Sequence, residues 1–312
     1  MTRTNSKRRY RDTLVVAGLL TAGSWFAGFS IATATAITSL LDPSAGETTA
    51  EPPLGLTVSR VLLALLSIVC ALAACWRMAN ARLPWPHQPG RRSTILSWRT
   101  FARRGRRLGM LHSPRSLTTV LWVYLIYFAV LLCGKSIGDF LTEVVSPSEP
   151  AQYPFAATSS SGYVWGQLVL LALAGPTEEL LFAATMPLLA FMVIKNKSVA
   201  LLSAVVVSTV LRVMFHLYYG LPASVGIAFW AATAVLLWWK TGQLLSLVLA
   251  HSANNVIAGL NQFSEHFPRW AGDFALILLI AVPLTLALWS SGRRTTWLTP
   301  RAVQTPEPTR ER

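Results

Sequence analysis

The chain has 312 residues, of which 53% are hydrophobic and 13% are charged, and its formal net charge is +14. Apolar residues are spread over most of its length, which excludes an ordinary soluble domain. The basic excess does not indicate nucleic-acid binding, because nearly all of it lies in segments that the positive-inside rule assigns to the anionic inner leaflet. We therefore expect a membrane protein that has the lipid bilayer as its surroundings and no nucleic-acid partner.

Apolar windows long enough to cross the hydrocarbon core, about 20 residues each, follow one another along the chain. They lie at 14–41, 54–76, 117–137, 163–194, 198–217, 222–239, 242–260 and 272–289. These windows predict an all-α fold, a polytopic transmembrane helical bundle of about eight spans. The first apolar run is too long for an ordinary secretory signal, so we expect it to remain as a span.

The spans are grouped by the polar segments between them. We expect a basic cytoplasmic N-terminus at 1–13, three spans within 14–137 with a basic cytoplasmic loop at 77–116, a core of four spans at 160–260, a last span at 272–289 and a disordered cytoplasmic tail at 293–312. The window 163–194 is long enough for two crossings, but only a single crossing keeps Lys195 and Lys240 on the side of the other basic segments. Both termini are then cytoplasmic, and we expect a multi-pass protein of the plasma membrane.

Few strongly polar side chains lie at membrane depth, where a charged group costs about 2.5–3.5 kcal/mol on insertion scales and marks a functional site by default. They are Glu178 and Glu179 on the fourth span, Arg212 and His216 on the fifth, and His251, Asn254 and Asn255 on the seventh. The members of two pairs, Arg212 with His216 and His251 with Asn255, are four residues apart and share a helix face. We expect these faces to meet at one interior point.

A carboxylate, two imidazoles and an amide around one cavity can hydrolyse a carbonyl compound. A glutamate in a dry pocket is a competent general base for water, and His216 can hold that water or share its proton. As hydrogen-bond donors, His251 and Asn255 can stabilise the oxyanion that forms when water attacks. A covalent nucleophile is disfavoured, because Ser252 is adjacent to His251 and adjacent helical residues do not face each other.

The same side chains permit a second chemistry, because two histidines and one glutamate are the protein ligands of many catalytic zinc sites. The ligands would be Glu178, His216 and His251. The chain lacks the His-Glu-x-x-His helix of familiar zinc peptidases, so we expect catalysis without a metal and keep zinc as the less favoured alternative.

The motifs resemble those of the CPBP family, the CAAX-processing and bacteriocin-processing intramembrane proteases that are also called the Abi family. That family carries Glu-Glu-x-x-x-Arg on one helix, Phe-x-x-x-His on a later helix and His-x-x-x-Asn or His-x-x-x-Asp on another. Here Glu178-Glu179 matches the first pair, His216 ends the second motif, and His251 to Asn255 gives the third. The resemblance covers about residues 160–260 and includes the order and spacing of the motifs.

The resemblance implies a role for each matching residue. Glu178 would activate the water, and His216 would help to position it. His251 and Asn255 would form the oxyanion site, and Glu179 would be a supporting carboxylate. The implied activity is that of a glutamic-type endopeptidase that acts on a membrane-embedded or membrane-associated peptide or protein.

Two positions depart from the family pattern. The arginine of the first motif is replaced by Ala183, and the phenylalanine of the second motif is replaced by Arg212. We hypothesise that Arg212 supplies the missing guanidinium from another helix by pairing with Glu179, which would leave Glu178 free to act as the base.

Two other functions remain open on the sequence alone. One is a non-catalytic immunity or scaffold protein whose buried charges only hold helices together or sequester a partner. The other is a proton-coupled transporter in which Glu178, Glu179 and His216 relay protons, although paired broken helices in an inverted repeat are absent from the pattern.

Overall fold

In the computed structural model, the described residues are 3–41, 54–80, 117–145, 161–268 and 270–295, and within these ranges the secondary structure is helical. The elements are α1 (Arg3–Leu41), α2 (Leu54–Asn80), α4 (Leu117–Val145), α5 (Ser161–Glu178), η3 (Glu179–Thr185), α6 (Met186–Val193), α7 (Lys197–Phe215), η4 (Leu217–Tyr219), α8 (Leu221–Thr241), α9 (Leu244–Gln262) and α10 (Trp270–Thr295). In the described part of the chain, 8 helical segments are long and apolar enough to cross a membrane. The predicted all-α, polytopic bundle is thereby confirmed.

The helices are longer than several of the apolar windows. α1 begins at Arg3, inside the predicted N-terminal segment, and α4 continues to Val145. α10 continues to Thr295, so the first residues of the predicted tail are helical. The fourth window forms one span, Ser161–Val193, as predicted. Most of the basic loop and the rest of the tail lie outside the described residues, and the cytoplasmic position of the termini stays a prediction.

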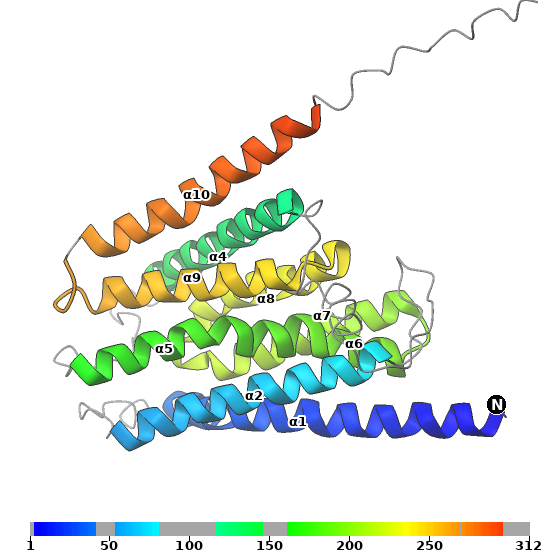
Figure 1. The fold of residues 1–312 in the computed structure, drawn as a ribbon. Coiled ribbons are helices and arrows are strands. Elements are labelled where there is room, and N and C mark those ends of the chain that lie inside the picture. The colour runs from blue at the N-terminus through cyan, green and yellow to red at the C-terminus, as the bar shows by residue number, and fades with distance from the viewer. Residues whose placement is uncertain (1–2, 42–53, 81–116, 146–160, 269, 296–312) are drawn as a thin grey trace, which may run out of the picture.

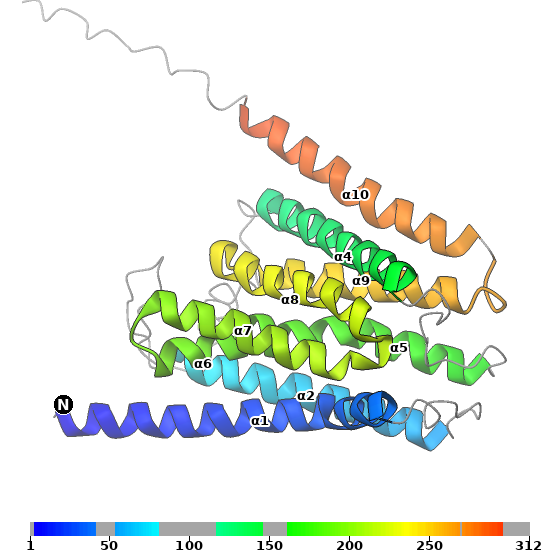
Figure 2. The same ribbon diagram turned by 180° about the vertical axis from the view of Figure 1, so that it is seen from behind.

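The fourth span lies in the middle of the bundle (Figures 1 and 2). It consists of α5, η3 and α6 in a continuous line, with α1 and α2 on one side and α9, α8 and α4 on the other. α10 lies at the edge, against α4 and α9. The largest buried apolar cluster lies where residues of α2, α4, α8 and α9 pack around η3 and α6. This arrangement places η3, which begins with Glu179, among side chains of several helices.

Glycines allow two close helix contacts around this centre. A Cβ atom on Gly134 of α4 would lie 2.8 Å from the carbonyl oxygen of Gly226 on α8. A Cβ atom on Gly175 of α5 would lie 2.5 Å from the carbonyl oxygen of Val248 on α9. Small residues let backbones approach in this way within membranes, where packing and hydrogen bonds hold helices together. The first contact holds α8 against α4, and the second holds α9 against the fourth span.

Candidate active site

The fourth span changes from α-helix to π-helix at Glu179, in the seven residues Glu179–Thr185. The N–H group of Met186 accordingly donates to the carbonyl of Leu181, five residues back. Pro187 has no N–H group, so the Phe182 carbonyl lacks the donor that the π pattern would provide. The hydroxyl of Ser208 on α7 donates to this carbonyl instead, at 2.9 Å. The proline therefore explains why α7 is hydrogen-bonded to the π segment.

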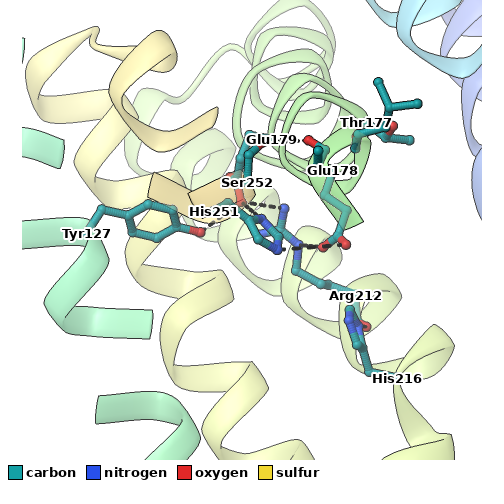
Figure 3. Close-up of polar contacts among 10 residues, drawn as sticks. Tyr127, Thr177, Glu178, Glu179, Arg212, His216, His251 and Ser252 are labelled. Atoms are coloured by element: carbon teal, nitrogen blue, oxygen red, sulfur yellow. Dashed lines mark hydrogen bonds and ion pairs between the residues drawn. The ribbon is translucent and has the colours of Figure 1, made fainter. Parts of the chain in front are cut away.

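Both acids of the fourth span are buried and both contact Arg212 of α7 (Figure 3). Nη2 of Arg212 lies 3.0 Å from Oε1 of Glu179, and Nε lies 3.3 Å from Oε2 of Glu178. The ion pair between Arg212 and Glu179 is present as hypothesised. Glu178 is not free of this cation as the hypothesis required, because the same guanidinium also contacts it, and its role as the base stays a prediction. One cation, fully buried on α7, therefore serves two carboxylates.

A single oxygen atom, Oε1 of Glu179, joins three other helices. It accepts hydrogen bonds from Oη of Tyr127 on α4 at 2.8 Å and from Nη2 of Arg212 at 3.0 Å. It also pairs with Nδ1 of His251 on α9 at 2.7 Å. Hydrogen bonds to a charged acceptor are stronger than neutral ones. Glu179 is therefore an anchor that fixes the positions of the groups around it.

Aromatic rings enclose the Arg212 guanidinium. Its central carbon lies 5.1 Å from the centre of the Phe182 ring and 4.6 Å from the centre of the Trp230 ring. The same Trp230 ring lies edge-on to the His251 ring, with 5.2 Å between centres. Cation–π contacts strengthen when the cation is removed from water, as it is here. Trp230 of α8 thus supports both the guanidinium and the imidazole.

The contacts of His251 determine how its ring is protonated. A carboxylate only accepts hydrogen bonds, so Nδ1 must carry a proton to pair with Glu179. The other ring nitrogen, Nε2, faces Oε1 of Glu178 at 3.9 Å. The next residue, Ser252, donates to the Ala172 carbonyl of α5 at 2.7 Å and so ties the two helices together. His251 is therefore held on one side by Glu179 and presents its second nitrogen to Glu178.

His216 lies outside this cluster (Figure 3). α7 ends at Phe215, and Nδ1 of His216 donates to the Arg212 carbonyl at 2.8 Å. Its ring packs on Phe215, with 4.1 Å between centres, and stacks with Tyr219. Four-residue spacing aligns side chains only along a continuing helix. Since the helix stops one residue earlier, the predicted alignment of His216 with Arg212 is lost and no hydrogen bond joins it to the acids in the described structure.

Asn255 is on the same helix as His251, one turn further, as its spacing predicted. Its side chain is half-buried, and in the described ranges no hydrogen bond connects it to either acid. Among the predicted site residues, the fold therefore brings Glu178, Glu179, Arg212 and His251 into contact. His216 and Asn255 lie near them without joining the same network.

Several polar atoms of the cluster are buried and have no hydrogen-bond partner within the described residues. They are Oε2 of Glu178, Oε2 of Glu179, and Nε and Nη1 of Arg212. The Nε atom is close enough to Glu178 for a charge contact but is poorly aligned for a hydrogen bond. Such groups in a folded protein are where water or a polar ligand binds. These atoms are therefore the ones in the cluster that a water molecule or a polar ligand would contact.

The charges of the cluster do not cancel when His251 is neutral. Two carboxylates and one guanidinium leave one negative charge, which protonation of the imidazole at Nε2 would balance. A doubly protonated His251 would then donate from both nitrogens, one to Glu179 and the other toward Glu178 or a substrate. The cluster therefore has one more carboxylate than guanidinium, and Nε2 of His251 faces the second carboxylate.

The side chains do not form the ligand set proposed for zinc. In the described segments no group of three histidine, cysteine, aspartate or glutamate side chains is arranged to hold a metal ion. Nδ1 of His216 is bound to a backbone carbonyl, and the Arg212 guanidinium already places a positive charge against Glu178. The expectation of catalysis without a metal stays a prediction, with a test given below.

Sequence reasoning missed Tyr127 and Trp230. Tyrosines of membrane proteins concentrate at the two interfaces, where the hydroxyl reaches water. Tyr127 instead lies at the midpoint of the predicted span 117–137, and this position was a readable sign of a buried partner. For Trp230 the sequence gives no such sign, because its contacts with Arg212 and His251 arise from the packing of three helices.

Comparison with known protein families gives a match over the segment that contains Glu178, Glu179, Arg212 and His251. Residues 160–257 match the family model described as type II CAAX prenyl endopeptidase Rce1-like. This match confirms the resemblance to the CAAX-processing proteases over α5 to α9. Neither the curated proteins nor the solved structures contain a match to the chain. Tyr127 lies outside the matched segment.

Proposed function

We propose that this protein is an intramembrane endopeptidase that hydrolyses a peptide bond with a water molecule activated by Glu178. The observation that supports this most is the meeting of two buried carboxylates, a guanidinium and an imidazole from three helices, within the segment that matches the protease family. A purely structural ion pair would need one acid and one base. Here a second acid and a histidine with an unshared ring nitrogen accompany them.

In the proposed reaction, Glu178 accepts a proton from water while the water oxygen bonds to the carbonyl carbon of the substrate. The carbonyl oxygen becomes an oxyanion, which Nε2–H of protonated His251 stabilises, together with a nearby donor of Arg212. When the carbon–nitrogen bond breaks, Glu178 gives its proton to the leaving amine. The products are a carboxylic acid and an amine, and the carboxyl group of Glu178 is again ionised.

Glu179 has a different function in this proposal. Its Oε1 atom is already occupied by Tyr127, Arg212 and His251. It therefore serves to orient His251 and Arg212 rather than to activate water. His216 and Asn255 are assigned to substrate or water contacts at the edge of the cluster, where both residues are half-buried.

The proposed substrate is a membrane-associated peptide or protein tail, because the acids lie near the middle of a span. The match to a CAAX prenyl endopeptidase family makes a prenylated C-terminal peptide one candidate, and a bacteriocin-like or maturing peptide is the other. We place the protein in the plasma membrane with both termini on the cytoplasmic side, as the distribution of basic residues predicts.

Cleavage by the purified protein tests this function. Wild-type and Glu178→Gln proteins, reconstituted in liposomes, are incubated with a pool of membrane-derived peptides and a farnesylated CAAX peptide, and products are identified by mass spectrometry. In ¹⁸O-labelled water we expect wild type to place one labelled oxygen in each new carboxyl group. The glutamine variant should be at least about a hundredfold slower, the usual contribution of a general base. Product formation at equal rates would exclude Glu178 as the base.

A non-catalytic scaffold is the second candidate, and a specific contact favours it. Because Arg212 contacts both acids, the cluster could serve only as an ion-pair network that holds the fourth and fifth spans together. In that case wild-type liposomes would yield no products from any peptide in the pool. Loss of Arg212 would then disrupt folding but remove no activity.

A further inference from the structure

Tyr127 occupies a position in the apolar core but carries a polar hydroxyl group. Its ring is fully buried in the main apolar cluster, where phenylalanine would fill the same space. A buried hydroxyl without a partner is unfavourable, whereas one that donates to a carboxylate is stabilising. The hydroxyl of Tyr127 donates to Oε1 of Glu179 at 2.8 Å. The tyrosine therefore contributes a polar contact to the cluster in addition to packing.

The contact of Tyr127 with Glu179 also affects how the Arg212 guanidinium interacts with Glu178 and Glu179. Of the three donors to Oε1 of Glu179, Arg212 is a cation and His251 becomes one when its second ring nitrogen is protonated, whereas the hydroxyl of Tyr127 donates as a neutral group. It stabilises the negative charge of Glu179 without moving Arg212, whose Nε atom lies 3.3 Å from Oε2 of Glu178. Without this hydroxyl, Glu179 would rely on Arg212 and His251 alone. Both would be pulled toward it and away from Glu178.

We propose that Tyr127 is a positioning residue of the site, whose hydroxyl fixes Glu179 and through it the orientation of His251 toward Glu178. This inference deepens the proposed peptidase function and rests on it for its effect on rate. It also extends the site to α4, outside the segment 160–257 that matches the protease family. The site would then require the third span, α4, as well as the family core.

The same helix supplies a matched control. Tyr124 lies one turn before Tyr127 and is also buried, but its hydroxyl has no hydrogen-bond partner within the described residues. Tyr124→Phe and Tyr127→Phe remove the same atom from the same helix. They differ in whether that atom contacts Glu179. Any effect of losing a buried hydroxyl as such will therefore appear in both variants.

Two readouts test the proposal in full-length protein reconstituted in liposomes. One is the ¹⁵N solid-state NMR signal of the His251 ring, which is assigned with a His251→Gln variant and needs no substrate. The other is the kinetics of peptide cleavage. We expect Tyr127→Phe to shift the Nδ1 signal of His251 and to lower kcat about ten- to hundredfold with little change in KM, as for loss of a hydrogen bond to a charged group. Tyr124→Phe should change neither.

The outcomes separate the two proposals. If wild type cleaves nothing but the His251 signal still shifts in Tyr127→Phe alone, the peptidase function fails and the positioning of His251 by Tyr127 stands. If the His251 signal is the same in wild type and Tyr127→Phe, the positioning role is wrong, whatever happens to kcat. Equal shifts in both phenylalanine variants would also overturn it, because the effect would then come from packing.

Discussion

The central span Ser161–Val193 and the edge span Trp270–Ser291 show how differently two membrane helices can be used. The edge span is the more apolar of the two, yet only 11% of its apolar window is buried, against 61% for the central span. In water the more apolar segment would be the more deeply buried one. In a membrane, lipid satisfies the apolar surface, and the polar side chains are the ones that must be enclosed by protein.

The contacts of the two spans follow from this difference. The edge helix α10 is joined to α4 by hydrogen bonds such as that between Thr118 and Ser290, at 2.9 Å. The central span carries two acids, a π segment and glycine contacts, all of which face other helices. We therefore expect substitutions around the central span to have larger effects than substitutions in the edge span.

The largest effect is expected when Arg212 is removed. Arg212→Ala leaves two buried carboxylates without their cation, which typically destabilises by about 3–5 kcal/mol. Arg212→Lys keeps the charge but not the forked contact, so we expect a smaller loss. Leu288→Ala, at an exposed position of α10, should change stability by less than about 0.5 kcal/mol. Unfolding of the reconstituted variants in denaturant measures all three.

The experiment also tests whether Arg212 replaces the arginine that Ala183 lacks. If Arg212→Ala and Arg212→Lys both kept wild-type stability and activity, the proposed compensation would be excluded. An equal loss in Leu288→Ala would show that the central and edge spans do not differ in the way described.

A smaller effect is expected from Gly175→Ala. The added methyl group would meet the backbone of α9, with Val248 O at 2.5 Å and Ser252 N at 2.8 Å, and neither atom can move without shifting the helix. Overpacking of this kind costs about 1–3 kcal/mol. Gly18→Ala in α1 is the control, because no atom lies within 4 Å of its added Cβ. Thermal unfolding should show a lower midpoint for the first variant and no decrease for the second.

No effect is expected from metal removal. Because the Arg212 guanidinium already provides a cation next to Glu178, dialysis against a zinc chelator should leave both peptide cleavage and the unfolding midpoint unchanged. Loss of activity that is restored by Zn²⁺, but not by Mg²⁺, would contradict metal-free catalysis and require His216 to approach Glu178.

The fold could be predicted well because hydropathy depends on local composition. Eight windows of apolar residues correspond to the eight segments in the described ranges that are long enough to cross a membrane, including the single crossing at the fourth window. The ends were less accurate, since α1, α4 and α10 extend into polar residues that a hydropathy window excludes. A helix in contact with water at its ends needs no apolar residues there.

The candidate site could be predicted only in part. Glu178, Glu179, Arg212 and His251 were identifiable because a charged or polar side chain at membrane depth needs a partner. His216 was expected in the same network, but the end of α7 at Phe215 turns its ring toward a backbone carbonyl. Tyr127 was not identified because its midspan position indicates a buried partner but not which one, and Glu179 lies 52 residues away in the sequence.

By itself, the sequence determined that this is a helical membrane protein with a small set of buried polar residues resembling a protease motif. These properties depend on composition and on spacing along single helices, which are local. Only the tertiary structure decided that one guanidinium contacts both acids, that Glu179 is the anchor, and that Tyr127 from a distant helix completes the network. These contacts depend on glycine-mediated helix packing and on the π segment, which set the relative rotation of whole helices.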